Sequence, residues 1–125
     1  YNLGSDTLKF ALTNTAPTAA TDTGFLPGSL HPPPAAANGY TAGGHAATIS
    51  GSSESGGVYT LATTTDVVIT ATAGGIGPFR YVILYDDTAL SDELIGYYDY
   101  GSSQTLTAAG ETFTIDVTAS LLTLT

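Results

Sequence analysis

The side chains of this sequence with the greatest capacity for chemistry lie in one segment, YVILYDDTALSDELIGYYDYG, which runs from Tyr81 to Gly101. Its carboxylates belong to Asp86, Asp87, Asp92, Glu93 and Asp99. Such oxygens are the ligands that Ca²⁺ prefers, but the spacing lacks the alternating acids and the central glycine of an EF-hand loop. We therefore interpret the segment as a hairpin with a solvated polar loop over 86–92, and a bound cation is the alternative.

Paired carboxylates can also hydrolyse a glycosidic bond, provided that a cleft positions the sugar between them. Tyr97, Tyr98 and Tyr100 offer aromatic rings on which a sugar could stack. Alternating tyrosines in a strand are more common as core and rim residues whose hydroxyl groups reach solvent. We expect no catalytic residue here, and we keep a carbohydrate-binding face over Tyr97–Tyr100 as a hypothesis.

The histidines and the glycine-rich segment complete the chemically capable residues. His31 and His45 have no second and third zinc ligand at the usual spacing, and no G-x-S-x-G motif supports a serine nucleophile. We interpret both histidines as surface or loop residues. Gly74, Gly75 and Gly77 of AGGIGPF do not follow the dinucleotide-binding pattern and are predicted to form turns. The sequence thus predicts no metal, cofactor or catalytic site, and no enzyme.

Composition restricts the partners. The 125 residues suit one domain, and 11 acids against Lys9 and Arg80 give a net charge of −9. Nucleic acids and anionic membranes need more basic residues than Lys9 and Arg80 can supply. With only 10% charged residues, the surface is rich in Thr, Ser and Gly, as in many secreted, cell-surface and virion proteins. The sequence opens at Tyr1 without a methionine, so we expect further residues ahead of it in the full protein.

Apolar residues recur at every second position, which predicts strands and not helices. The clearest alternation is TFTIDV (112–117), whereas PFRYVILYD (78–86) is apolar on both faces and predicts a central, doubly covered strand. The predicted strands are 7–13, 46–50, 57–63, 66–72, 79–86, 93–100, 103–107, 112–118 and 121–125. The predicted connections are 51–57, 73–78, 100–104 and 108–111.

These elements predict an all-β fold, a single antiparallel β-sandwich of which a jelly-roll is one form. The predicted core is Leu8, Phe10, Leu12, Ile49, Leu61, Val67, Ile69, Phe79, Ile83, Leu94, Phe113, Ile115 and Val117. Residues 16–45 hold five of the six prolines and no clear periodicity. They form either a long loop, packed on the sandwich by Phe25, Leu26 and Leu30, or an arm that reaches a neighbouring subunit.

Four blocks carry a resemblance to a known family. They are NLGSDTLKFALTNTAP at 2–17, NGYTAGG at 38–44, GPFRYVILYDDT at 77–88, and LIGYYDYGSS with AAGETFTID within 94–116. In this order the blocks resemble a family of small β-rich virion structural proteins of tailed phages and prophages. The segment FLPGSLHPPPAAA at 25–37 is longer and richer in proline than in that family, which leaves open whether it makes the same contacts.

The resemblance implies a non-enzymatic virion protein, and we expect a capsid decoration (cement) protein on the capsid surface. Its expected partners are the major capsid protein or other virion proteins and further copies of itself, with a trimer as one stoichiometry. Expected contact regions are 1–6, 16–45 and Tyr97–Gly101. A subunit of a tail, fibre or extracellular filament is the second hypothesis, and a carbohydrate-binding or adhesion module is the third.

Overall fold

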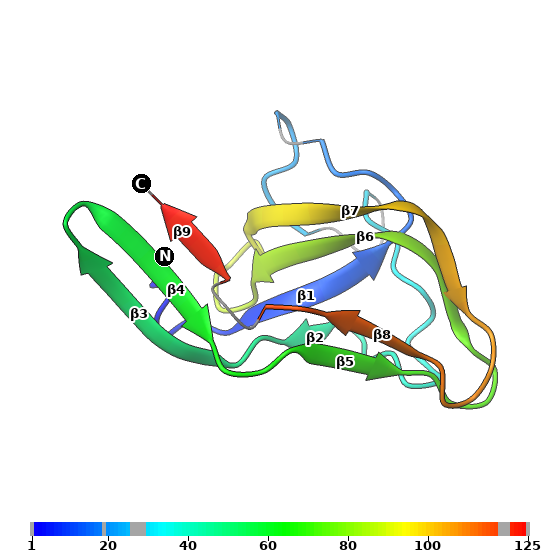
Figure 1. Cartoon of the computed structure of the whole chain (residues 1–125). Coiled ribbons are helices and arrows are strands. Elements are labelled where there is room, and N and C mark those ends of the chain that lie inside the picture. The colour runs from blue at the N-terminus through cyan, green and yellow to red at the C-terminus, as the bar shows by residue number, and fades with distance from the viewer. Residues whose placement is uncertain (1, 19, 26–29, 118–120, 125) are drawn as a thin grey trace.

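The computed structural model describes residues 2–18, 20–25, 30–117 and 121–124 of the chain. Within these residues the chain forms antiparallel strands and no helix (Figure 1). None of them therefore belongs to a helix long and apolar enough to cross a bilayer. The all-β prediction is confirmed, and the arrangement is consistent with a β-sandwich, while the jelly-roll form stays a prediction.

The strands of the described residues form three sheets. The largest has four strands in the order β2 (His45–Ala46), β1 (Leu8–Thr13), β6 (Ile76–Asp86) and β7 (Leu94–Leu106). The second has β3 (Ile49–Ser55), β4 (Val58–Thr63) and β9 (Leu122–Leu124) in that order. The third pairs β5 (Val67–Thr70) with β8 (Thr112–Ile115). In Figure 1 the β5–β8 pair lies across the four-stranded sheet, and the β3–β4 hairpin extends from one end with β9 beside it.

The main core lies between the four-stranded sheet and the smaller sheets. Alternate residues of β1 and β6, such as Phe10 and Val82, pack there against Ile69 of β5 and Ile115 of β8. A second cluster lies on the opposite face of the large sheet, where Ile83, Tyr85 and Ala11 contact Phe25. Because β6 contributes to both clusters, the prediction of a central, doubly covered strand is confirmed. Every predicted core residue belongs to one of the two clusters or packs against it.

Described residues within 16–45 contribute to both clusters. Phe25 is buried against Tyr85, with ring centroids 4.7 Å apart, and Gly24 forms a β-bridge with Glu93 at the start of β7. Tyr40 is buried in the main core, where its hydroxyl oxygen accepts a hydrogen bond from the N–H of Leu12 at 3.0 Å. Of the other expected packing residues, Leu30 is exposed, and Leu26 lies outside the described residues.

Two predicted connections are instead strand. Residues 51–55 belong to β3, because a tight turn at Gly56 and Gly57, both with positive φ, returns the chain directly into β4. Residues 100–104 continue β7, which bends at Gly101 and does not end there, since a glycine accommodates the φ of 96°. Serine-rich composition suggested loops at both places, and pairing with β4 and β6 overrides that tendency.

Smaller differences concern where strands begin. The expected strand 46–50 is split into β2 and β3, and β6 begins at Ile76 within the predicted connection 73–78. Gly74 and Gly75 do form a turn, in which the N–H of Gly75 donates to the carbonyl of Thr72 at 3.2 Å. The connection at 108–111 is observed as predicted.

Candidate functional site

The acidic loop between β6 and β7 is organised around a buried carboxylate. Asp86, the last residue of β6, is 0% exposed, and its Oδ1 accepts hydrogen bonds from the N–H groups of Thr88 at 2.9 Å and Ala89 at 3.3 Å. An aspartate that bonds the backbone ahead of it stabilises a turn. The hairpin prediction is thus confirmed, but the expectation that all its acids are solvated is wrong for Asp86.

The acidic side chains around Asp86 differ in their burial and in their partners. Lys9 Nζ lies 2.9 Å from Asp87 Oδ2, and burial together with the negative charge of Asp87 raises the pKa of Asp92. Asp86 Oδ2 and Glu93 Oε2 are buried without a hydrogen-bond partner in the described part of the chain. Among those residues no group of three or more His, Asp or Glu side chains is placed to hold a metal ion.

Tyr85 connects this loop to the rest of the fold. Its hydroxyl donates to the carbonyl of Gly43 at 2.6 Å, while its ring stacks on Phe25. Burial, followed by the negative charge of Asp87, raises the pKa of the Tyr85 phenol above its ordinary value. The phenol therefore acts as a neutral donor that fixes the 41–44 turn against the large sheet.

The histidines lie in different environments. His31 lies in a loop, as expected, yet its ring is 0% exposed, with Nε2 3.1 Å from Asp22 Oδ2 and the ring stacked on Phe25. A hydrogen bond from the N–H of Thr18, and then the contact with His31, lower the pKa of Asp22. His45 lies in β2, half-buried, and burial lowers its pKa.

Strand β7 presents the tyrosines at the surface, as predicted. Tyr97, Tyr98 and Tyr100 are 44%, 49% and 58% exposed. Along this strand successive side chains alternate between the two faces of the sheet, so Tyr98 and Tyr100 share the face toward the main core while Tyr97 lies on the other. These rings give β7 a broad, aromatic and accessible surface.

An ion pair organises the Tyr97 face. Arg80 donates to both carboxylate oxygens of Asp99, from Nε at 2.8 Å and from Nη2 at 2.9 Å. Its guanidinium carbon lies 5.3 Å from the centre of the Tyr81 ring. The bonds from Arg80, and then the one from the N–H of Gly101, lower the pKa of Asp99. Asp99 is thus held ionised and neutralised within β7.

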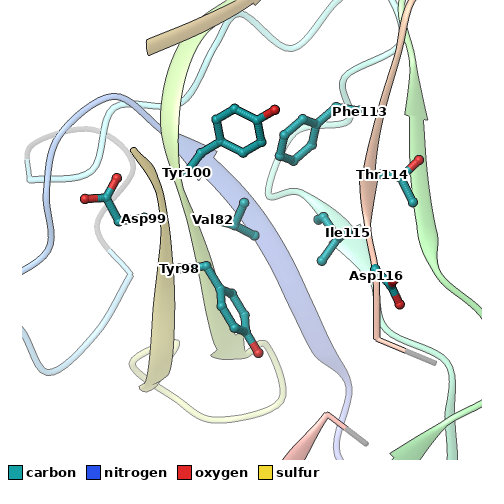
Figure 2. A pocket seen from close by; sticks show the side chains of 8 residues that line it. All are labelled: Val82, Tyr98, Asp99, Tyr100, Phe113, Thr114, Ile115 and Asp116. Atoms are coloured by element: carbon teal, nitrogen blue, oxygen red, sulfur yellow. The ribbon is translucent and has the colours of Figure 1, made fainter. Parts of the chain in front are cut away.

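A groove of about 200 Å³ separates β7 from β8. Figure 2 shows Val82 and Ile115 between the strands, Tyr98 at one end, and Tyr100 beside Phe113 at the other. The rings of Tyr100 and Phe113 meet edge-on with centroids 5.6 Å apart. Asp99 points to the opposite side of β7 in the same view, and the groove is lined mainly by apolar and aromatic side chains, with Thr114 and Asp116 as polar members of the β8 side.

A second hollow of about 280 Å³ lies where β7 begins. It is lined by Leu3, Leu94, Ile95, Leu122 and Leu124, and it joins the N-terminal segment to β7 and β9. Leu124 is more than half exposed. Apolar side chains are therefore accessible at the start of β7 and, in the groove, along its middle.

Sequence reasoning found the tyrosines of this surface but missed the groove. Tyr98 and Tyr100 stand at period-two spacing, a visible signal. Phe113 and Ile115 were assigned to the core, and their approach to β7 depends on sheet packing between segments far apart in the chain. No single window of sequence contains that information.

Comparisons with models of known protein families, with curated proteins and with solved structures give no match to this chain.

Proposed function

We propose that this chain is a non-enzymatic virion structural protein that decorates the capsid of a tailed phage. The observation that carries the proposal is the accessible surface along β7, where Tyr97, Tyr98 and Tyr100 are each at least 44% exposed. Tyrosine is enriched in protein interfaces because a large rigid ring carries a polar tip. A decoration protein acts through such contact surfaces rather than through reactive groups.

The scaffold beneath this surface suits that task. β6 is covered on both faces by packed side chains and holds β7 through antiparallel pairing over most of its length. A surface on a strand of a packed sheet is more rigid than one on a loop, so docking orders few additional groups. Residues 2–6 and the described parts of 16–45 are further candidate contact regions.

The proposed partners are the major capsid protein or other virion proteins, and further copies of this chain, with a trimer as one stoichiometry. Lys9 and Arg80, the two basic residues, are both engaged by carboxylates of the chain itself. Neither is therefore available for phosphate groups, which supports a protein partner over a nucleic acid or an anionic membrane.

Quantitative mass spectrometry of purified virions tests the proposal. A decoration protein is expected at a copy number that is a simple fraction of the major capsid protein, because it occupies a repeated lattice site. A count on the order of a dozen or fewer per particle would reject the capsid location and favour the tail or neck.

The alternative structural role is a subunit of a tail, fibre or filament. β7 and β9 each lie at the end of a sheet, so both have one edge without a neighbouring strand in the described chain. Such edges can join a neighbour's sheet, and a contact that does not close generates a filament. Helical tubes in electron micrographs of the purified protein would support this role, and discrete small oligomers would count against it.

The groove between β7 and β8 favours carbohydrate binding as a further candidate. Tyr98, Tyr100 and Phe113 line it with aromatic rings of the kind that contact the apolar face of a sugar. A glycan array should then show binding that Tyr98→Ala abolishes and that Tyr97→Ala, on the opposite face, leaves intact. Absence of binding to every glycan, or equal losses in both variants, would remove this candidate.

A further inference from the structure

β7 is a long strand with one open edge. It is the last strand of the four-stranded sheet, with β6 on one side. On the other side, in the described part of the chain, residues 23–25 pair through their backbone only with its start, where the N–H of Leu94 donates to the carbonyl of Thr23 at 3.0 Å. An exposed strand edge of this kind is a template for pairing with another strand.

The pairing of β1 and β6 fixes which backbone groups face this edge. The N–H of Leu12 bonds the hydroxyl of Tyr40 and not β6, and Leu12 lies opposite Val82. In an antiparallel pair, residues opposite each other either exchange both backbone bonds or point away from each other. Val82 therefore points its backbone toward β7, where it lies opposite Tyr98.

The backbone N–H and C=O groups of Tyr98 therefore bond to β6, whereas those of its two neighbours point away from β6. Because backbone direction alternates along a strand, Tyr97 and Asp99 direct their N–H and C=O groups to the open edge. Their pairing opposite Ile83 and Tyr81 of β6 is of the type that exchanges no backbone bonds. These outward groups lie at the middle of the exposed stretch 96–103.

The charge distribution along this edge favours a second copy of this chain as the partner. The chain carries a net charge of −9, which repels a second copy over most of the surface. Residues 94–106 contain one acid, Asp99, and its two bonds from Arg80 neutralise it. The β7 edge is therefore a stretch where two equally acidic chains can approach without opposing unpaired charges.

We propose that two copies of this chain pair edge to edge through β7, antiparallel about a twofold axis at Tyr98. In this register Tyr97 of each copy lies opposite Asp99 of the other, and the outward N–H and C=O groups form four hydrogen bonds. The two Tyr98 rings meet side by side at the mouth of the groove, as an aromatic cross-strand pair. The two four-stranded sheets join into one.

The pairing stands independently of the virion proposal, since it concerns only the free chain in solution. A twofold contact closes after two copies. The structure thus predicts a particle of two chains, and it distinguishes this pairing from a trimer built on another surface.

A proline at position 97 is the sharpest test. Tyr97→Pro removes an outward N–H and leaves the bonds to β6 intact, which sheet edges tolerate. Light scattering coupled to size-exclusion chromatography should give the mass of two chains for the wild type. The dimer dissociation constant should rise at least about tenfold in Tyr97→Pro, since two hydrogen bonds are lost per dimer. Tyr97→Ala, which keeps the N–H, should retain the two-chain mass.

Hydrogen exchange of the wild-type chain provides a second measurement that does not depend on whether the proline variant folds. The amides of Tyr97 and Asp99 should be protected at high protein concentration and exchange freely on dilution, while the Tyr98 amide stays protected in both. Added salt should tighten the dimer by screening the repulsion between the two acidic chains. A single-chain mass, a Tyr97→Pro variant that dimerises like the wild type, or concentration-independent exchange at Tyr97 and Asp99 would overturn the pairing.

Discussion

At the scale of single residues, Asp86 shows how a carboxylate can be structural in a segment that suggests catalysis. Its Oδ1 ends β6 by bonding two backbone N–H groups, while its Oδ2 has no hydrogen-bond partner in the described chain. The acid-rich sequence around it predicted a polar loop correctly. Full burial of Asp86 could not be predicted, because it depends on the packing of β6 beside β1, where Asp86 lies opposite Leu8.

Asp86→Ala removes the oxygen that holds the loop after β6. Two part-buried N–H groups lose their charged acceptor, so the free energy of unfolding should fall by about 1–3 kcal/mol in urea titrations. Asp86→Asn keeps an acceptor at the same place and should lose clearly less. Equal losses in the two variants would show that the charge of Asp86, and not its turn bonds, stabilises the hairpin.

The raised pKa of Asp92 predicts that the stability of the fold depends on pH. Burial and then the charge of Asp87 raise its pKa, so the ionised form destabilises the fold at neutral pH. Asp92→Asn, which tolerates the φ of 49°, should stabilise the protein by less than about 1 kcal/mol. The gain should be present above the raised pKa and vanish as the pH falls to the ordinary value of 3.8, which thermal melts across this range would measure. A gain that persists at lower pH would contradict the electrostatic cause.

At the scale of elements, β7 contains two glycines that behave differently. Gly101 has a φ of 96°, whereas Gly96 does not have a positive φ, and an added Cβ meets nothing within 4 Å at either position. Gly101→Ala should therefore lose about 1–2 kcal/mol through backbone strain alone. Gly96→Ala should be neutral or gain up to about 1 kcal/mol. Chemical unfolding of both variants at one protein concentration compares them, and equal effects would refute the bend at Gly101.

The packing of Phe25, within residues 16–45, on the face of the large sheet opposite the main core gives another element-scale prediction. Phe25 is 3% exposed and stacks on Tyr85, so Phe25→Ala should lose about 3 kcal/mol of unfolding free energy. Leu30→Ala, at a position 45% exposed, should change it by under about 0.5 kcal/mol. A small loss for Phe25→Ala in calorimetry would show that this segment is a free arm.

The sequence predicts strands correctly where apolar residues are regularly placed, and it misses strand residues where pairing overrides a loop-like, Ser-rich composition. β1 and β8 alternate visibly and β6 is apolar on both faces, and these three strands supply most of the buried core residues. Ser-rich residues 51–55 and 100–104 suggested connections, yet each pairs with an adjacent strand. A glycine with positive φ lies at each place, and sequence alone does not show whether such a residue ends a strand or bends it.

At the scale of the whole molecule, the all-β class followed from composition and alternation, but the surface did not. The open edge of β7 and the groove beside β8 arise from which strands lie at the ends of the sheets. That order is set by contacts between segments far apart in the chain. The candidate surface could therefore be predicted only as a row of tyrosines.

The most direct test of β7 as the contact surface is hydrogen–deuterium exchange of the protein in purified virions compared with the free chain at high dilution. Assembly should slow exchange across peptides that cover 94–106, because both the outward amides and the tyrosine face become buried. Residues 49–63 on the extended hairpin should change less. Unchanged exchange over 94–106, with protection confined to other strands, would contradict the account.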